Sequence, residues 1–184
     1  MKKICFLVFT LHSLSSFAQK GNNNLFAEYE DTLKVMAHRI MNAETEAEKR
    51  LANTAFITNL TEVLQYEKSF TFPFDSLPTI ARILSPDNTF RIFNWLLKKD
   101  NGAYEYYAIV HYHNIKRKRY EIIPLVDNSA NIRNAEQEDL DAKNWYGGIY
   151  YQIAYIKKIG RKYYTLLAWD GNDGYSTKKI IDVL

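Results

Sequence analysis

Apolar residues between positions 24 and 68 recur at steps of three and four, which is the spacing of an α-helix that buries one side. Asn24 is suited to cap a first helix, and Thr45 followed by Glu48 has the form of a capping box that begins a second. The pattern therefore predicts a helical hairpin with its bend near Asn42. Its two apolar stripes consist of Phe26, Tyr29, Leu33, Met36, Ala37, Ile40 and Met41, and of Ala52, Phe56, Leu60 and Val63.

From Thr79 onward the period changes to two, which is typical of β-strands. The preceding segment, SFTFPFDSLP, contains two prolines and alternating phenylalanines, so we expect an extended connector there. Most connections between the predicted strands are short enough for hairpins, and hairpins make neighbouring strands antiparallel. The fold class is therefore α+β: a helical region at 24–68 followed by an antiparallel meander of about seven strands. We expect these strands at 79–84, 89–97, 103–113, 119–126, 146–157, 162–169 and 177–184.

Two features of the β-rich half depart from a simple meander. The connection at 127–144 is long and polar, and four acidic residues around Leu140 predict one short surface helix. The last segment, KKIIDVL, has alternating apolar residues up to the end of the chain. A strand of this kind needs neighbours on both faces or at its edge. Either this strand is internal to the sheet, or the chain is a C-terminally truncated piece of a longer protein.

The first 18 residues have the parts of a secretory signal peptide: Lys2 and Lys3, an apolar run at 4–14, and small residues at Ser16 and Ala18. Cleavage after Ala18 leaves residues 19–184 as a single domain, which we expect to be periplasmic or secreted. A retained anchor is the alternative. The apolar run has about half of the roughly 20 residues that a spanning helix needs, so we expect no stable membrane span after cleavage.

The leader also contains the single cysteine, Cys5, so the predicted mature chain has none. This excludes a disulfide framework, a thiolate nucleophile and cysteine-ligated metal sites. Loss of two lysines with the leader lowers the formal net charge from +3 to +1. A near-neutral domain argues against general nucleic-acid binding, which needs a broad basic surface.

Three segments of the β-rich half, SPDNTFRIFNW, WYGGIYYQI and YYTLLAWDGNDGYSTKKIIDVL, resemble a family of exported bacterial proteins of unknown function. The resemblance covers most of residues 75–184. It implies secretion and a single β-rich unit, and it implies that the natural chain continues past Leu184. It implies no catalytic residue.

Within AWDGNDGYS, the side chains of Asp170, Asn172 and Asp173 are oxygen donors that suit calcium. The EF-hand spacing fails, because glycine and tyrosine occupy the next two positions where a ligand and a glycine are required. The competing interpretation is a hairpin turn in which the glycines supply positive φ angles, and the sequence favours the turn.

His111 and His113 lie two apart on a predicted strand, so both side chains point to one face and could bind a metal ion. With Asp170 or Asp173 nearby, they would support a metal-assisted hydrolase. The sequence supplies no third ligand next to them, and Ile109 on the same face indicates partial burial. Two hydrogen-bonded or solvated histidines are therefore the favoured interpretation.

Aromatic residues gather in the β-rich half, where 12 of the 14 tyrosines follow residue 103. Adjacent pairs must place one ring on each face of a strand, so an outer aromatic face could stack on a sugar or bind a protein. Its candidate members are Tyr107, Tyr151, Tyr164 and Trp169. The alternative is that the N-terminal helices cover these rings.

The remaining motifs point away from catalysis. KRKR at 116–119 is typical of a solvated hairpin tip. No GxGxxG, P-loop, GxSxG or HExxH motif occurs, so we expect no cofactor. The sequence favours a non-enzymatic module that binds an envelope protein or glycan, without nucleic-acid binding. The alternatives are the His111/His113 hydrolase and a structural domain of a longer surface protein.

Overall fold

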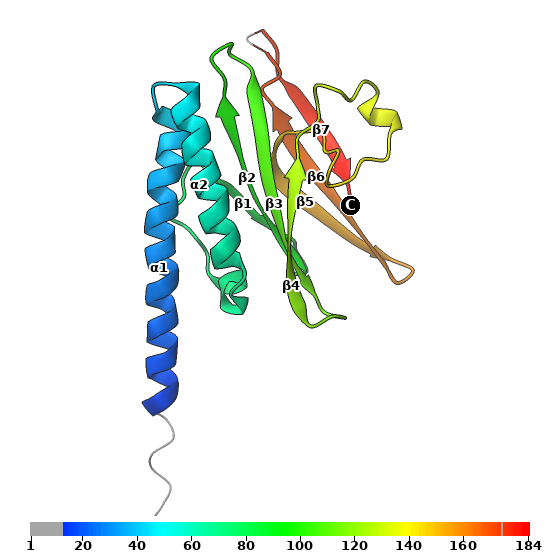
Figure 1. Cartoon of the computed structure of the whole chain (residues 1–184). Helices are drawn as coiled ribbons and strands as arrows, with labels where there is room; N and C mark the ends of the chain where they lie inside the picture. The colour runs from blue at the N-terminus through cyan, green and yellow to red at the C-terminus, as the bar shows by residue number, and fades with distance from the viewer. Residues whose placement is uncertain (1–12, 174) are drawn as a thin grey trace, which may run out of the picture.

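Three layers make up the chain: a helical hairpin, a four-stranded sheet and a three-stranded sheet (Figure 1). The structure is a computed structural model that describes residues 13–173 and 175–184, with side chains from residue 24 onward. The helices are α1 (Ser13–Asn42), α2 (Glu46–Leu64) and the short 3-10 helix η1 (Glu67–Thr71). The hairpin and the antiparallel strands confirm the predicted α+β class.

The helical hairpin begins earlier than predicted. Helix α1 starts at Ser13 rather than at Asn24, whose amide donates to the Glu28 carboxylate one turn along instead of capping. The capping box of α2 is confirmed, because the Glu48 N–H donates to the Thr45 hydroxyl at 3.2 Å and Thr45 N–H donates back to Glu48. Most of the predicted signal peptide lies outside the described residues. Within the described part, no helix has the length and apolar character required to span a membrane.

The strands divide into two sheets at the long connection after β4. The first sheet has the order β1 (Ala81–Leu84), β2 (Phe90–Lys98), β3 (Tyr104–Asn114), β4 (Arg119–Val126). The second has the order β5 (Ile149–Lys158), β6 (Arg161–Asp170), β7 (Lys178–Val183). Every pair is antiparallel, as predicted. The prediction of a surface helix in this connection is wrong in its length, because only a 3-10 turn at Ala135–Gln137 forms there.

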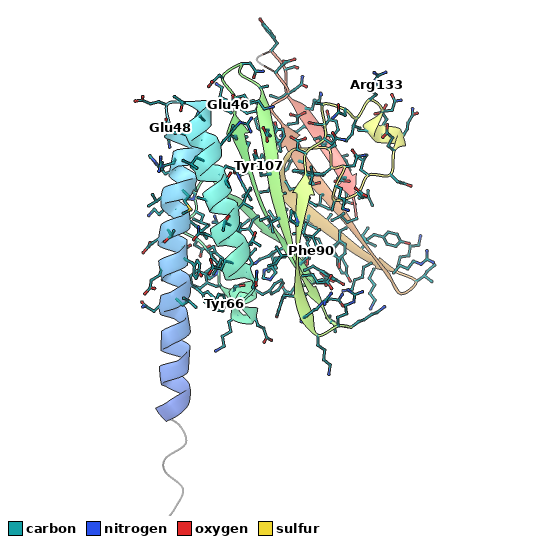
Figure 2. The ribbon with its side chains drawn as sticks, viewed as in Figure 1. Glu46, Glu48, Tyr66, Phe90, Tyr107 and Arg133 are labelled. Carbon is teal, nitrogen blue, oxygen red and sulfur yellow. The ribbon has the colours of Figure 1, made fainter. Side chains whose placement is uncertain are left out.

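Strand β2 lies in the middle layer and is buried on both faces. Phe93, Trp95 and Leu97 pack under the helices, while Phe90 and Ile92 pack against the second sheet. Figure 2 shows Tyr107 between α2 and the first sheet, and Phe90 on the side of the second sheet. Two hydrophobic cores therefore share one strand.

Asn94 links the two sheets through this strand. Its side chain is fully buried, its amide donates to the Tyr107 carbonyl at 2.8 Å, and its Oδ1 accepts from the Tyr150 N–H at 2.6 Å. The next residue, Trp95, donates its indole N–H to the Asn53 side chain of α2 at 2.7 Å. Buried polar groups thus join β2 to a helix on one face and to β5 on the other.

We predict that Asn94→Ala lowers the free energy of unfolding by about 2 to 4 kcal/mol, because it leaves a buried N–H and a buried carbonyl without partners. Urea unfolding measures this loss. The control is Asn134→Ala, which removes an exposed amide from the long connection. A loss equal to that of the control would contradict the role of Asn94 as a link between the sheets.

Candidate functional site

A cleft lies between the two sheets. Strand β5 packs on β1 and β2, so the sheets are closed along that side. On the other side β4 and β7 diverge, and twelve residues of the long connection, between Ser129 and Tyr146, line the space between them. The cleft has a volume of about 1140 Å³. It therefore slightly exceeds the range of about 300 to 1,000 Å³ that is usual for small-molecule sites in proteins.

Both sheets contribute to an apolar floor in this cleft. Val110, Ile123 and Leu125 come from the first sheet, and Ile180 comes from β7. All four side chains are only half-buried, although aliphatic side chains of this kind gain stability from full burial. The floor is completed by Ile92 and Leu166, which are fully buried between the sheets.

The long connection is held in place beside β4 by backbone hydrogen bonds. Val126 N–H donates to the Ala142 carbonyl at 2.8 Å, and Trp145 N–H donates to the Val126 carbonyl at 3.0 Å. The Asp127 carboxylate accepts from the Tyr106 N–H at 3.0 Å and packs so closely on Gly147 that a side chain there would collide with it. Ile132 and Leu140 of the connection then line the cleft opposite the sheets.

A satisfied polar chain lies at the inner wall of the cleft. Trp145 Nε1 donates to the Tyr150 hydroxyl at 2.7 Å, and this hydroxyl donates to Asp182 Oδ2 at 2.6 Å. Burial and the neighbouring Asp182 carboxylate raise the pKa of Tyr150 well above its ordinary value, so its hydroxyl stays neutral. Tyr150 therefore supplies a fixed, uncharged wall.

Apart from Asp182, whose carboxylate accepts from Tyr150 at the inner wall, the charged side chains of the lining lie at the rim of the cleft. Arg133 lies on the long connection at the outer side of the molecule (Figure 2). The other exposed rim residues are Glu136, Glu138, Asp139 and Asp141 on the connection, and Lys178 and Lys179 on β7. An apolar floor with a charged rim suits a molecule whose body is apolar and whose end reaches water.

The four proposed metal ligands are not brought together. His111 and His113 lie on the face of β3 toward the connector that contains Phe70. Asp170 bonds to Tyr106, whose ring belongs to the core between the sheets on the other face, and Asp173 lies in the β6–β7 turn. Among the described residues, no three histidine, cysteine, aspartate or glutamate side chains form a group that could hold a metal ion.

His111 belongs to a buried arrangement around an arginine that sequence reasoning missed. Its Nδ1 accepts from Arg91 Nε at 3.3 Å, its ring is fully buried, and its Nε2 has no hydrogen-bond partner among the described residues. Arg91 also donates to the backbone carbonyls of Ser69 and Phe72, at 2.5 and 2.7 Å. Arg91 and His111 of the sheet thus hold the connector against it. The sequence signal was a single arginine within the apolar run FRIFNW.

Burial sets the ionisation of both groups. It lowers the pKa of Arg91 to about 9, so the guanidinium stays charged at neutral pH. Burial and the positive charge of Arg91 lower the pKa of His111 to about 3, so the imidazole is neutral. Its Nδ1 accepts the hydrogen bond from Arg91 and is therefore not available to bind a metal ion.

The stretch AWDGNDGYS forms the β6–β7 hairpin turn, as predicted. Asp170 Oδ1 accepts from the Asn172 N–H at 2.7 Å, and Asp173 Oδ1 accepts from the Ser176 N–H at 2.8 Å, so both carboxylates stabilise the turn. The positive φ lies at Asn172 and not at Gly171. Gly171 is needed because a Cβ there would lie 2.4 Å from the Tyr104 ring. Gly174 lies outside the described residues.

The predicted aromatic surface does not form one patch. Tyr107 stacks on Trp95 beneath the helices, and Tyr164 is buried between the sheets, where its hydroxyl donates to Asp87. Trp169 is half-buried beside Tyr104. Tyr151 is 47% exposed on the second sheet, under the ammonium group of Lys179. The aromatic residues that line the cleft are instead Trp145, Tyr146 and Tyr150.

Comparisons of the chain with protein-family models, with curated proteins and with solved structures found no match. The resemblance to a family of exported bacterial proteins therefore stays a prediction.

We predict that His111 makes the protein less stable in acid. The unfolded chain binds a proton near pH 6.5 while the folded imidazole does not, so stability falls as the pH drops from 6.5 toward 3. Between pH 6.5 and about pH 5, this group lowers the free energy of unfolding by about 2 kcal/mol. The variant His111→Gln keeps an acceptor for Arg91. Urea unfolding at both pH values should show that its free energy of unfolding does not fall by this amount. The control His113→Gln should retain the fall, and equal acid sensitivity of His111→Gln and the parent protein would contradict the assignment.

Proposed function

We propose that this protein is a non-enzymatic binding module that holds an elongated apolar molecule, of the lipid acyl-chain type, in the cleft between its sheets. The single observation that carries the proposal is the partly exposed aliphatic floor, formed by Val110, Ile123, Leu125 and Ile180. These side chains come from both sheets and face a common space. A ligand that fills this space would complete their burial.

The shape of the cleft favours a chain-like ligand. The six residues of β7 and Leu184 after it all contribute atoms to its lining. A strand of this length extends about 20 Å at ~3.3 Å per residue. The cleft is therefore long, which suits an extended hydrocarbon chain better than a compact ring system.

The chemistry of the walls favours binding over reaction. The polar groups of Trp145, Tyr150 and Asp182 satisfy one another. The charged residues at the rim, with Arg133 and Lys178 among them, could contact a polar head group. The specificity would then come from apolar contact along the floor and from charge at one end.

The place of action that we propose is the cell envelope. Its support is the sequence at residues 1–18, with two lysines, an apolar run and small residues at 16 and 18. In that compartment lipids are the abundant chain-like apolar molecules. Binding to an envelope protein or glycan through Tyr151, the exposed member of the predicted aromatic set, stays a second sequence-based prediction.

A fluorescent fatty acid, cis-parinaric acid, tests the proposal. We predict saturable binding with a stoichiometry of one and a rise in fluorescence on transfer into the apolar cleft. Ile123→Glu places a charge on the floor and should weaken binding about tenfold or more, because a buried aliphatic side chain contributes about 1.5 to 3 kcal/mol. Fluorescence titration measures both affinities.

The matched control is Leu84→Glu, which places the same charge on β1, at the opposite edge of the same sheet and outside the cleft lining. Leu84 is about half-exposed. Its variant should bind as the parent protein does. Equal weakening by both substitutions, or no saturable binding by the folded parent protein, would overturn the proposal.

A further inference from the structure

Two basic hairpin tips project from one end of the two sheets (Figure 1). The β3–β4 tip carries residues 116–119, KRKR, and the β5–β6 tip carries residues 157–162, KKIGRK. The turn before β2 joins their bases: the Thr89 carbonyl accepts from the His113 N–H at 2.8 Å, and Lys162 Nζ donates to the Thr89 hydroxyl at 2.9 Å. Segments some 40 residues apart in sequence thus form one surface, which we call the basic end.

Positive charge is concentrated at the basic end. Its eight lysines and arginines face two carboxylates, since Glu121 pairs with Arg117 and Arg119, and Asp87 pairs with Lys162. These ten residues carry a formal charge of +6, while the whole chain carries +3, so the rest of the chain carries −3. The charge is therefore strongly polarised. Five of the basic side chains have no acidic partner within salt-bridge distance among the described residues: Lys116, Lys118, Lys157, Lys158 and Arg161.

Each tip also presents an isoleucine to water. Ile115 is 65% exposed and Ile159 is 92% exposed. Ile159 has a φ of +49° and precedes Gly160 at +73°, in a two-residue turn where asparagine and glycine are the favoured pair. A β-branched residue is strained at such a φ. Neither burial nor backbone geometry explains an isoleucine at this position, so folding gives no reason for it.

We propose that the basic end docks on a membrane surface that contains anionic phospholipids, with Ile115 and Ile159 entering the interfacial layer and the flanking lysines and arginines contacting phosphate groups. Positive charge beside exposed aliphatic side chains is the combination that binds such a surface. Single-stranded nucleic acid would require several aromatic platforms for the bases, whereas the most exposed apolar side chains of the two tips are Ile115 and Ile159, and Tyr163 beside Lys162 is 44% exposed. This proposal stands independently of the cleft, because it uses other residues.

Vesicle flotation tests it with the full chain and two vesicle compositions: phosphatidylcholine alone, and equal parts phosphatidylcholine and phosphatidylglycerol. We expect binding to the anionic vesicles at low salt and loss of that binding at high salt. Replacing Lys157, Lys158 and Arg161 by glutamine should weaken binding about a hundredfold, since each basic residue near the surface contributes to the attraction. The control replaces Lys34, Lys98 and Lys143, exposed lysines elsewhere, by glutamine and should bind nearly as the parent protein does.

Ile159→Asn separates membrane contact from folding. Asparagine accepts the positive φ, so the variant should be at least as stable to heat as the parent protein. It should nevertheless bind the anionic vesicles about tenfold more weakly, because it removes an apolar side chain from the interface. Unchanged vesicle binding by Ile159→Asn would overturn the proposal. Binding of a single-stranded oligonucleotide in preference to the vesicles would overturn it in favour of nucleic acid.

Discussion

The burial of β2 on both faces is the constraint on which the rest of the structure depends. A strand that packs under helices on one side and against a second sheet on the other cannot leave its polar groups to water. Arg91, Asn94 and Trp95 therefore each have a partner on a different element: the connector at 69–72, β5 and α2. Hydrogen bonds of this kind are costly to break in a buried setting, so they fix the relative positions of all three layers.

The cleft follows from how the second sheet is attached. Strand β5 packs on β1 and β2, and Asn94 binds its backbone at Tyr150. No comparable polar link fixes β7 to β4 among the described residues, and the long connection passes between these two strands. The sheets therefore meet on one side and diverge on the other. The divergence leaves aliphatic side chains partly exposed on an inner surface, where they favour an apolar molecule over bulk water.

The sequence predicted local structure well and arrangement less well. Periodicity located the helical hairpin and all seven strands, and Thr45 with Glu48 identified a capping box that the structure contains, because these features depend on neighbours a few positions apart. Periodicity could not show that β2 is buried on both faces. A strand with one buried face and a strand in the middle layer are both rich in apolar residues, so the pattern does not distinguish them. The aromatic prediction assumed one outer face, whereas the division into two sheets buries Tyr164 and the helices cover Tyr107. The cleft depends on contacts between residues such as Ile123 and Ile180, which are far apart in sequence.

Methyl-resolved NMR of the protein titrated with a saturated fatty acid tests most directly whether the space between the diverging sheets is the binding surface. The account predicts saturable shifts in the methyl groups of Val110, Ile123, Leu125 and Ile180. It predicts little change for Leu33 and Leu60, which lie in the core under the helices. Shifts confined to Ile156, on the exposed face of the second sheet, or distributed equally over both cores would contradict it.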